Sequence, residues 1–270
     1  MVPQDRSPGV VPPVPCVDLL VGGGRGRDAT GVAATTTALV TGANKGLGRE
    51  TARRLAELGW QVFLAARDAT RGMAAVAELA GDGWDVEFVP LDVTSDESAA
   101  AAASAVKARA GRLDVLVNNA GTGGPHREPA DTRPSDLREV FEVNVFGPVR
   151  VTHAFLPLLR AAEHPRIVMV SSGMGSVATI TDPNLSGLVP PALGYPASKA
   201  ALNMMTTQYA RALVEIKINA VDPGYTATDM TDHSGFQTVT EGTDAIVRLA
   251  RIGPDGPTGQ FFDRIGPVPW

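Results

Sequence analysis

Tyr195 and Lys199 have the side-chain types and the spacing for acid–base chemistry. They stand four residues apart at the start of residues 195–213, whose pattern predicts a helix, so both side chains share one helix face. An ammonium group beside a phenol favours the phenolate and lowers a phenol pKa that is ordinarily about 10. With only three tyrosines in the chain, such a match arises by chance only rarely. The pair therefore predicts a reactive phenol.

A glycine-rich stretch, Thr41 to Gly48, follows a short apolar run and opens a helical pattern over residues 47–58. Phosphate groups bind at such places because backbone N–H groups and the positive end of the helix dipole are available there. Gly42, Gly46 and Gly48 lack the side chains that would block a close approach. On local sequence alone, an ordinary glycine-rich turn is the alternative.

Gly147-Pro148 lies in the middle of a helix predicted over residues 135–159. Because proline has no N–H, the carbonyl of Asn144, four residues earlier than Pro148, loses its usual donor. That carbonyl could accept a hydrogen bond from another group. The alternative is a simple kink for packing.

Short apolar runs alternate with longer helical patterns from Ala38 onward. The predicted strands cover residues 38–40, 61–65, 86–89, 113–117, 166–170, 216–221 and 259–262. The predicted helices cover residues 47–58, 68–79, 95–111, 135–159, 195–213 and 244–251. Such alternation predicts right-handed crossovers, an α/β fold and a parallel sheet covered on both faces. A ligand is expected at the carboxyl ends of the strands.

The composition of the 270 residues is that of one globular domain, with 44% hydrophobic and 20% charged residues. We expect residues 1–36, which show no sustained period, to be a flexible leader and residues 37–270 to be the domain. The net charge of −5 and the absence of a basic run argue against nucleic acid as a partner. A single cysteine, Cys16, and no long apolar segment favour a cytoplasmic protein that is not bound to membranes.

Several motifs then stand in one order along the chain. They are Thr41-Gly-Ala-Asn-Lys-Gly-Leu-Gly48, Asn118-Asn119-Ala120-Gly121, Asn144, Ser172, Tyr195-x-x-x-Lys199 and Pro223-Gly224. As a set they resemble the classical short-chain dehydrogenases/reductases over residues 38–270. The details that look most like the carbonyl reductase branch are Asn44-Lys45-Gly46, Ala66-Arg67-Asp68, Thr228-Asp229-Met230 and Trp270. The resemblance implies a single-domain Rossmann fold with a doubly wound, mostly parallel seven-stranded sheet.

The resemblance also implies a carbonyl reductase that turns an aldehyde, ketone or quinone into an alcohol. Tyr195 would be the general acid, and Lys199 would lower its pKa and bind the cofactor ribose. Ser172 would hold the substrate oxygen, whereas its neighbour Ser171 points to the other face of the strand and is expected to be structural. Asn144 would anchor a water of a proton relay.

NADPH is the expected cofactor. Ala66 stands where NAD-specific sites usually offer a carboxylate to the ribose 2′-OH, and Arg67 and Lys45 supply cations for a 2′-phosphate. Asp68 is the main objection, but its position suits a helix cap. Asn118 is expected to brace neighbouring strands rather than bind cofactor. The expected cofactor residues are Gly42, Asn44, Lys45, Gly46, Leu47, Gly48, Arg67, Asp92, Val93, Asn119, Ala120, Gly121, Tyr195, Lys199, Pro223, Gly224 and Thr228.

Two other functions stay open from the sequence. One is a non-catalytic NADP(H)-binding regulatory protein on the same fold, and the other is a nucleotide-sugar epimerase or dehydratase, which the glycine spacing disfavours. The four histidines share no metal-ligand spacing, so no metal is expected. The interval from Ser172 to Tyr195 is longer than in most classical members and adjoins the family's usual subunit interface. This interval leaves the oligomeric state undecided between a monomer and a homo-oligomer.

Overall fold

The computed structural model describes residues 35–184 and 190–270. Most of the predicted leader and Cys16 therefore lie outside the described residues. So does part of the long interval between Ser172 and Tyr195, namely residues 185–189.

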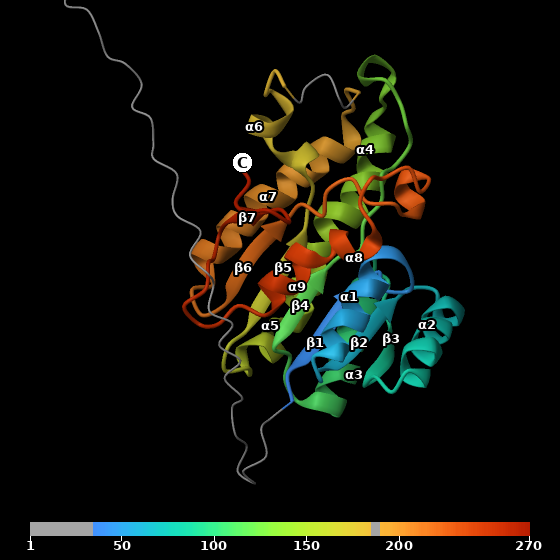
Figure 1. Ribbon diagram of the computed structural model, residues 1–270, viewed down its shortest axis with the longest axis vertical. Coiled ribbons are helices and arrows are strands. Elements are labelled where there is room, and N and C mark those ends of the chain that lie inside the picture. Colours follow the sequence, from blue (N-terminus) through green and yellow to red (C-terminus); the bar gives the residue numbers. More distant parts are fainter. Residues whose placement is uncertain (1–34, 185–189) are drawn as a thin grey trace, which may run out of the picture.

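Seven strands form one sheet in the order β3-β2-β1-β4-β5-β6-β7, and every neighbouring pair is parallel (Figure 1). The strands are β1 Thr37–Thr41, β2 Gln61–Ala66, β3 Val86–Pro90, β4 Val115–Asn118, β5 Arg166–Val170, β6 Lys217–Val221 and β7 Phe261–Phe262. The order runs one way from β1 to β3 and the other way from β4 to β7. This reversal between β1 and β4 opens a crevice at their carboxyl ends, where open α/β sheets bind ligands. The predicted fold class is confirmed.

Helices cover both faces of the sheet. The helices are α1 Gly46–Glu57, α2 Ala69–Gly81, α3 Asp96–Ala110, α4 Pro134–Phe141, α5 Gly147–Arg160, α6 Val177–Ile180, α7 Gly194–Ala212, α8 Val239–Gly242 and α9 Asp244–Ala250. One buried cluster joins α1, α2 and α9 to the sheet, and the other joins α3, α5 and α7 to its opposite face. Alternate strand residues supply the two clusters, as Leu39 and Val40 of β1 show.

Local sequence explains where several helices begin and end. Asp68 caps α2 by accepting from the Arg71 backbone N–H at 3.0 Å, which is the structural role expected for it. Ser95 caps α3 through the Ser98 N–H at 3.1 Å. Gly111 ends α3 with a φ of 73°, a left-handed conformation that glycine adopts without steric strain. Because β2 and β3 are parallel neighbours, the loops after them lie at the same edge of the sheet.

The helix predicted over residues 135–159 differs from the prediction. It is divided into α4 and α5 by a π-helical turn, Glu142–Phe146, in which the Gly147 N–H bonds to the carbonyl of Glu142. The physical cause is the missing N–H of Pro148, which breaks the regular ladder. A side chain on Gly147 would come within 3.1 Å of Val93, so glycine lets the helix approach the end of β3.

Two smaller differences lie in the second half of the chain. The short helix α8 before α9 was not predicted, and its Thr238 cap and Glu241 form a capping box. In the connection between α7 and β6, which the sequence analysis did not resolve, the Ile216 N–H bonds to the Leu213 carbonyl at 2.9 Å and closes a tight turn. No helix among residues 35–184 and 190–270 is long and apolar enough to cross a membrane.

Candidate active site

The glycine-rich turn lies between β1 and α1 and has the geometry of a phosphate-binding loop. Gly42 and Gly46 have φ values of 62° and 54°, where a side chain would be strained. A Cβ on Gly48 would lie 2.5 Å from Asn119 Nδ2 and 2.6 Å from the Gly42 carbonyl oxygen. The first turn of α1 carries no acidic residue, so its positive end is available to an anion.

The end of β4 braces this loop. Asn119 Nδ2 donates to the carbonyl of Thr41 at 2.8 Å, and Thr41 Oγ1 accepts from the backbone N–H groups of Asn119 and Ala120 at 3.0 Å each. Asn118, one residue earlier, is buried and donates to Thr152 Oγ1 at 3.2 Å. Its Nδ2 also donates to Met169 Sδ of β5 at 3.3 Å, so Asn118 braces β4 against a neighbouring strand, as expected, and also against α5. Asn119 shapes the floor of the crevice.

Tyr195 and Lys199 lie on α7, one turn apart, with the Lys199 Nζ 5.6 Å from the centre of the Tyr195 ring. Lys199 is only 4% exposed, and its Nζ donates to the Val170 carbonyl at 2.8 Å. This bond ties the ammonium to the end of β5. A Cβ on Gly121 would lie 3.7 Å from the same Nζ, so the loop after β4 borders it as well.

Ser172 faces the phenol, whereas Ser171 faces the helix core. Ser172 lies close enough to Tyr195 to lower the pKa of the phenol, and Ser172 Oγ accepts from the Met174 N–H at 3.2 Å. Ser171 is buried, and its Oγ bonds to Asn203 Oδ1 at 2.5 Å. The alternation along the strand thus separates a serine near the phenol from a structural one.

Asn144 lies in the π-helical turn and is buried. Its Oδ1 accepts from the Thr122 N–H at 2.8 Å, and its Nδ2 donates to the Thr122 carbonyl at 2.9 Å and to Ser198 Oγ at 3.0 Å. Ser198 Oγ in turn donates to the carbonyl of Tyr195 at 2.7 Å. Both N–H donors of the Asn144 side chain are therefore used, and the side chain joins the loop after β4 to the start of α7.

Burial dominates the titration of Tyr195 and Lys199. It raises the pKa of Tyr195 to about 12, with a smaller increase from the negative charge of Asp222 and an opposing decrease from the Ser172 hydrogen bond. Burial lowers the pKa of Lys199 to about 8, and Asp222 opposes this change. The pKa of Tyr195 is therefore raised, whereas the sequence predicted that Lys199 would lower it. The reason is that desolvation of the phenolate outweighs nearby charge.

The expected cofactor cations lie on the surface. Lys45 pairs with Asp229 at 2.5 Å, and both side chains are 57% exposed. Arg67 is exposed and acts with the Thr94 hydrogen bonds to lower the pKa of Asp92. Arg71, a further cation nearby, lies in the first turn of α2 and pairs with Asp68 at 3.3 Å.

The remaining predicted residues lie at the ends of β3 and β6. Val93 packs under Gly147, and Asp92 Oδ1 accepts from the Thr94 N–H at 2.9 Å. After β6, Gly224 has a φ of 71°, and a Cβ on it would lie 2.7 Å from Gln237 Oε1. Thr228 lies against the glycine-rich turn, because a Cβ on Gly46 would be 3.8 Å from its methyl group. Asn44 and Leu47 lie in the turn and at the start of α1.

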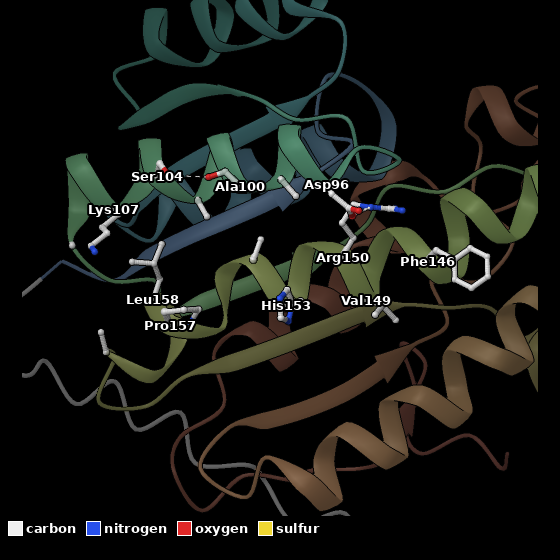
Figure 2. A pocket seen from close by; sticks show the side chains of 15 residues that line it. Asp96, Ala100, Ser104, Lys107, Phe146, Val149, Arg150, His153, Pro157 and Leu158 are labelled. Atoms are coloured by element: carbon white, nitrogen blue, oxygen red, sulfur yellow. Dashed lines mark hydrogen bonds and ion pairs between the residues drawn. The ribbon is translucent and has the colours of Figure 1, made fainter.

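A groove of about 1000 Å³ lies elsewhere, between α3 and α5 (Figure 2). Ala100 and Ser104 of α3 face His153 and Pro157 of α5 across it. None of the predicted catalytic residues lines this groove, so it is not the place for the chemistry described above. Within residues 35–184 and 190–270, no group of three or more His, Cys, Asp or Glu side chains could hold a metal ion.

Comparison with known proteins identifies the family. Residues 36–237 match the family described as short chain dehydrogenase. The chain belongs to the short-chain dehydrogenases. It is 34% identical to the (+)-neomenthol dehydrogenase of Arabidopsis thaliana, with 84% of this chain and 95% of that protein covered. It is 32% identical to the salutaridine reductase of Papaver bracteatum, with 84% and 93% covered.

A solved structure of a family member supports the same assignment. The NADPH-bound carbonyl reductase from chicken fatty liver superposes with a TM-score of 0.77 and 30% identity, covering 87% of this chain and 99% of that one. This short-chain dehydrogenase is thus an oxidoreductase, as its sequence motifs indicated.

Sequence reasoning missed three residues that shape the site. Thr41 holds the loop after β4 through its hydroxyl, and Thr122 holds Asn144. Asp222 is the first residue after β6, and its carboxylate interacts electrostatically with Tyr195 and Lys199. Its position directly before Pro223-Gly224 was the available signal, because a polar residue at a strand's carboxyl end faces the ligand crevice.

Proposed function

We propose that this short-chain dehydrogenase uses NADPH to reduce an aldehyde, ketone or quinone to an alcohol. The observation that supports it best is that Ser172 and the buried Lys199 both lie beside Tyr195 at the carboxyl edge of the sheet. Three groups that come from two different elements converge there. A regulatory protein that only binds cofactor has no need of this arrangement.

The protein's own residues fit a dinucleotide. Gly42, Gly46 and Gly48 leave a cradle that side chains would fill, and the open end of α1 adds positive potential for the pyrophosphate. Asn44, Leu47, Asn119, Ala120 and Gly121 would line the adjoining floor, with Asp92 and Val93 beside the adenine. Pro223, Gly224 and Thr228 would hold the nicotinamide end. Arg67, Lys45 and Arg71 would hold the 2′-phosphate, which is the basis for preferring NADPH.

When NADPH is bound at these residues, it would supply a hydride for the carbonyl carbon. Ser172 Oγ and the Tyr195 hydroxyl would donate hydrogen bonds to the carbonyl oxygen, and Tyr195 would pass its proton to that oxygen as the alcohol forms. With a pKa of about 12, Tyr195 carries its proton throughout the neutral range and is ready to act as an acid. Below pH 8, Lys199 is charged and stabilises the phenolate that is left behind.

Asn144 would act in returning a proton to Tyr195. Its side chain is occupied by Thr122 and Ser198, so a relay water would be held by its backbone carbonyl. Pro148, four residues further on, has no N–H to offer that carbonyl. Lys199 would connect this water to the phenol.

The decisive experiment follows NADPH absorbance with a panel of aldehydes, ketones and quinones. We expect Tyr195→Phe to lower turnover by about 10²–10⁴-fold, which is the usual contribution of a general acid. Tyr209→Phe is the matched control, since Tyr209 lies on the same helix but packs in the core, and its turnover should stay near that of the parent. NADPH binding without turnover of any compound would contradict the proposal and favour a regulatory protein.

A further inference from the structure

Asp222 is a carboxylate inside the site that the mechanism above does not use. It follows β6 directly, and its backbone N–H bonds to the Phe262 carbonyl at 2.8 Å, so β7 fixes its position. Burial raises its pKa, with a further contribution from the negative charge of Asp263. A fold that keeps a desolvated carboxylate here loses stability by doing so, which suggests that the group has a use.

The carboxylate lies between two backbone segments. Asp222 Oδ1 accepts from the Gly224 N–H at 3.0 Å, in the turn after β6. The backbone N–H of Gly173, in the loop after β5, lies close enough to the carboxylate to lower its pKa. A Cβ on Gly173 would lie 2.7 Å from Asp222 Oδ2, so only glycine lets the two loops approach this closely.

We propose that Asp222 is a positioning residue for the reduction, whose carboxylate clamps the loop that carries Ser172 to the Pro223-Gly224 turn and supplies a fixed negative charge to the catalytic pair. Gly173 is the residue directly after Ser172, so the clamp sets where the serine hydroxyl lies. The inference rests on the proposed function, because positioning matters only if Ser172 and Tyr195 act on a substrate.

The negative charge of Asp222 changes the pKa values of neighbouring groups in a known direction. The titratable groups around it are Tyr195 and Lys199 on α7 and Asp263 after β7. A negative charge raises the pKa of both Tyr195 and Lys199, which keeps the phenol protonated and the ammonium charged to higher pH. Both effects extend to higher pH the range in which Tyr195 can donate a proton to a carbonyl oxygen.

The Asp222→Asn variant distinguishes a positioning role of the carboxylate from a role in stabilising only the turn after β6. Asparagine keeps an acceptor for the Gly224 N–H, but it removes the charge and turns an N–H donor toward Gly173. We expect turnover to fall by about tenfold and the alkaline limb of the pH profile to move to lower pH by roughly half a unit. The melting temperature at neutral pH should not fall, because a desolvated charge has been removed.

Asp263→Asn is the control, since it makes the same change of charge one strand away. Asp263 Oδ1 accepts from the backbone N–H groups of Ile265 and Gly266, both at 2.7 Å, and its charge is not among the causes that shift the pKa of Tyr195 or Lys199. Its turnover and alkaline limb should match those of the parent.

Amide hydrogen exchange tests the clamp without turnover. The N–H of Gly173 should exchange faster in Asp222→Asn, and the N–H of Gly224 should do so only in Asp222→Ala. An Asp222→Asn enzyme with the parent's turnover, pH profile and Gly173 exchange would overturn the inference. A parent without turnover on any carbonyl compound would refute the proposed function instead, and unchanged Gly173 exchange would then still refute the clamp.

Discussion

The two halves of the site are built in different ways. Around the glycine-rich turn, backbone conformation and exposed cations dominate, and the Lys45 side chain is 57% exposed. At the ends of β4, β5 and β6, buried side chains with several hydrogen bonds dominate, and Lys199 is 4% exposed. Exposed charges contribute little to stability, whereas a buried charge lowers it unless it is well paired.

This difference indicates what each half is for. The first half offers shape and charge to a cofactor, so changes there should alter binding. The second half holds a desolvated lysine and phenol at fixed positions, so changes there should alter turnover. Substitutions in the first half should therefore change the affinity for NADPH, and substitutions in the second half should change turnover.

The largest effect is expected from Lys199→Met. It removes the ammonium that stabilises the Tyr195 phenolate, so turnover should fall by about 10²–10⁴-fold. The NADPH dissociation constant should differ far less between the variant and the parent. Lys217→Met, at the start of β6 and away from the site, is the control. Steady-state kinetics with NADPH fluorescence titration separates the two quantities. If Lys199→Met changed only cofactor binding, the division of the site into a binding half and a turnover half would be wrong.

The same variant predicts a stability effect with a definite sign. Burial lowers the folded-state pKa of Lys199 from 10.5 to about 8, so the unfolded chain holds this proton more tightly between these values. As pH rises through this window, the parent should gain stability over Lys199→Met by up to roughly 3 kcal/mol. Urea unfolding of both proteins at pH 7 and pH 10 measures the difference. An equal gap at both pH values would show that Lys199 is not desolvated.

Gly48→Ala should act mainly on binding. The new Cβ would lie within 2.6 Å of the Gly42 carbonyl, so the turn must shift, which costs about 1–3 kcal/mol. NADPH should therefore bind about 10–100-fold more weakly. Gly81→Ala, where no atom lies within 4 Å of the added Cβ, should leave binding unchanged. Parent-like affinity in Gly48→Ala would contradict the phosphate-loop interpretation.

The smallest effect is expected from Arg67→Ala. Loss of one exposed cation should lower the preference for NADPH over NADH by about tenfold without a change in maximal turnover. The control is Arg211→Ala in the last turn of α7, which lies outside the cofactor crevice. Competing titrations with the two cofactors give the ratio, and an unchanged ratio would remove Arg67 from the 2′-phosphate site.

The sequence was sufficient to predict the fold because the pattern repeats. Alternating apolar runs and helical patterns specify a parallel sheet, and caps such as Asp68 and Ser95 begin helices where local rules place them. The separation of Ser172 from Ser171 also follows from the two-residue period of a strand. Such features depend on near neighbours in the chain.

Features that depend on distant contacts could not be predicted in this way. The π-helical turn at Asn144 needs both Pro148 and the close approach of Gly147 to Val93, and only the proline is visible locally. The pKa of Tyr195 is set by burial in the folded chain, which spacing to Lys199 does not reveal. Asp222 meets Gly173 only because β5 and β6 are neighbours.

Transfer of deuterium from the cofactor to the product tests the central proposal most directly. The protein would be given NADPH deuterated at C4 of the nicotinamide, on one face in each of two reactions, with a carbonyl compound that it turns over. We predict an alcohol that carries one deuterium on the former carbonyl carbon from one of the two cofactors, and no such product with Tyr195→Phe in the same reaction time. An alcohol without deuterium from either cofactor would contradict direct hydride reduction at this site.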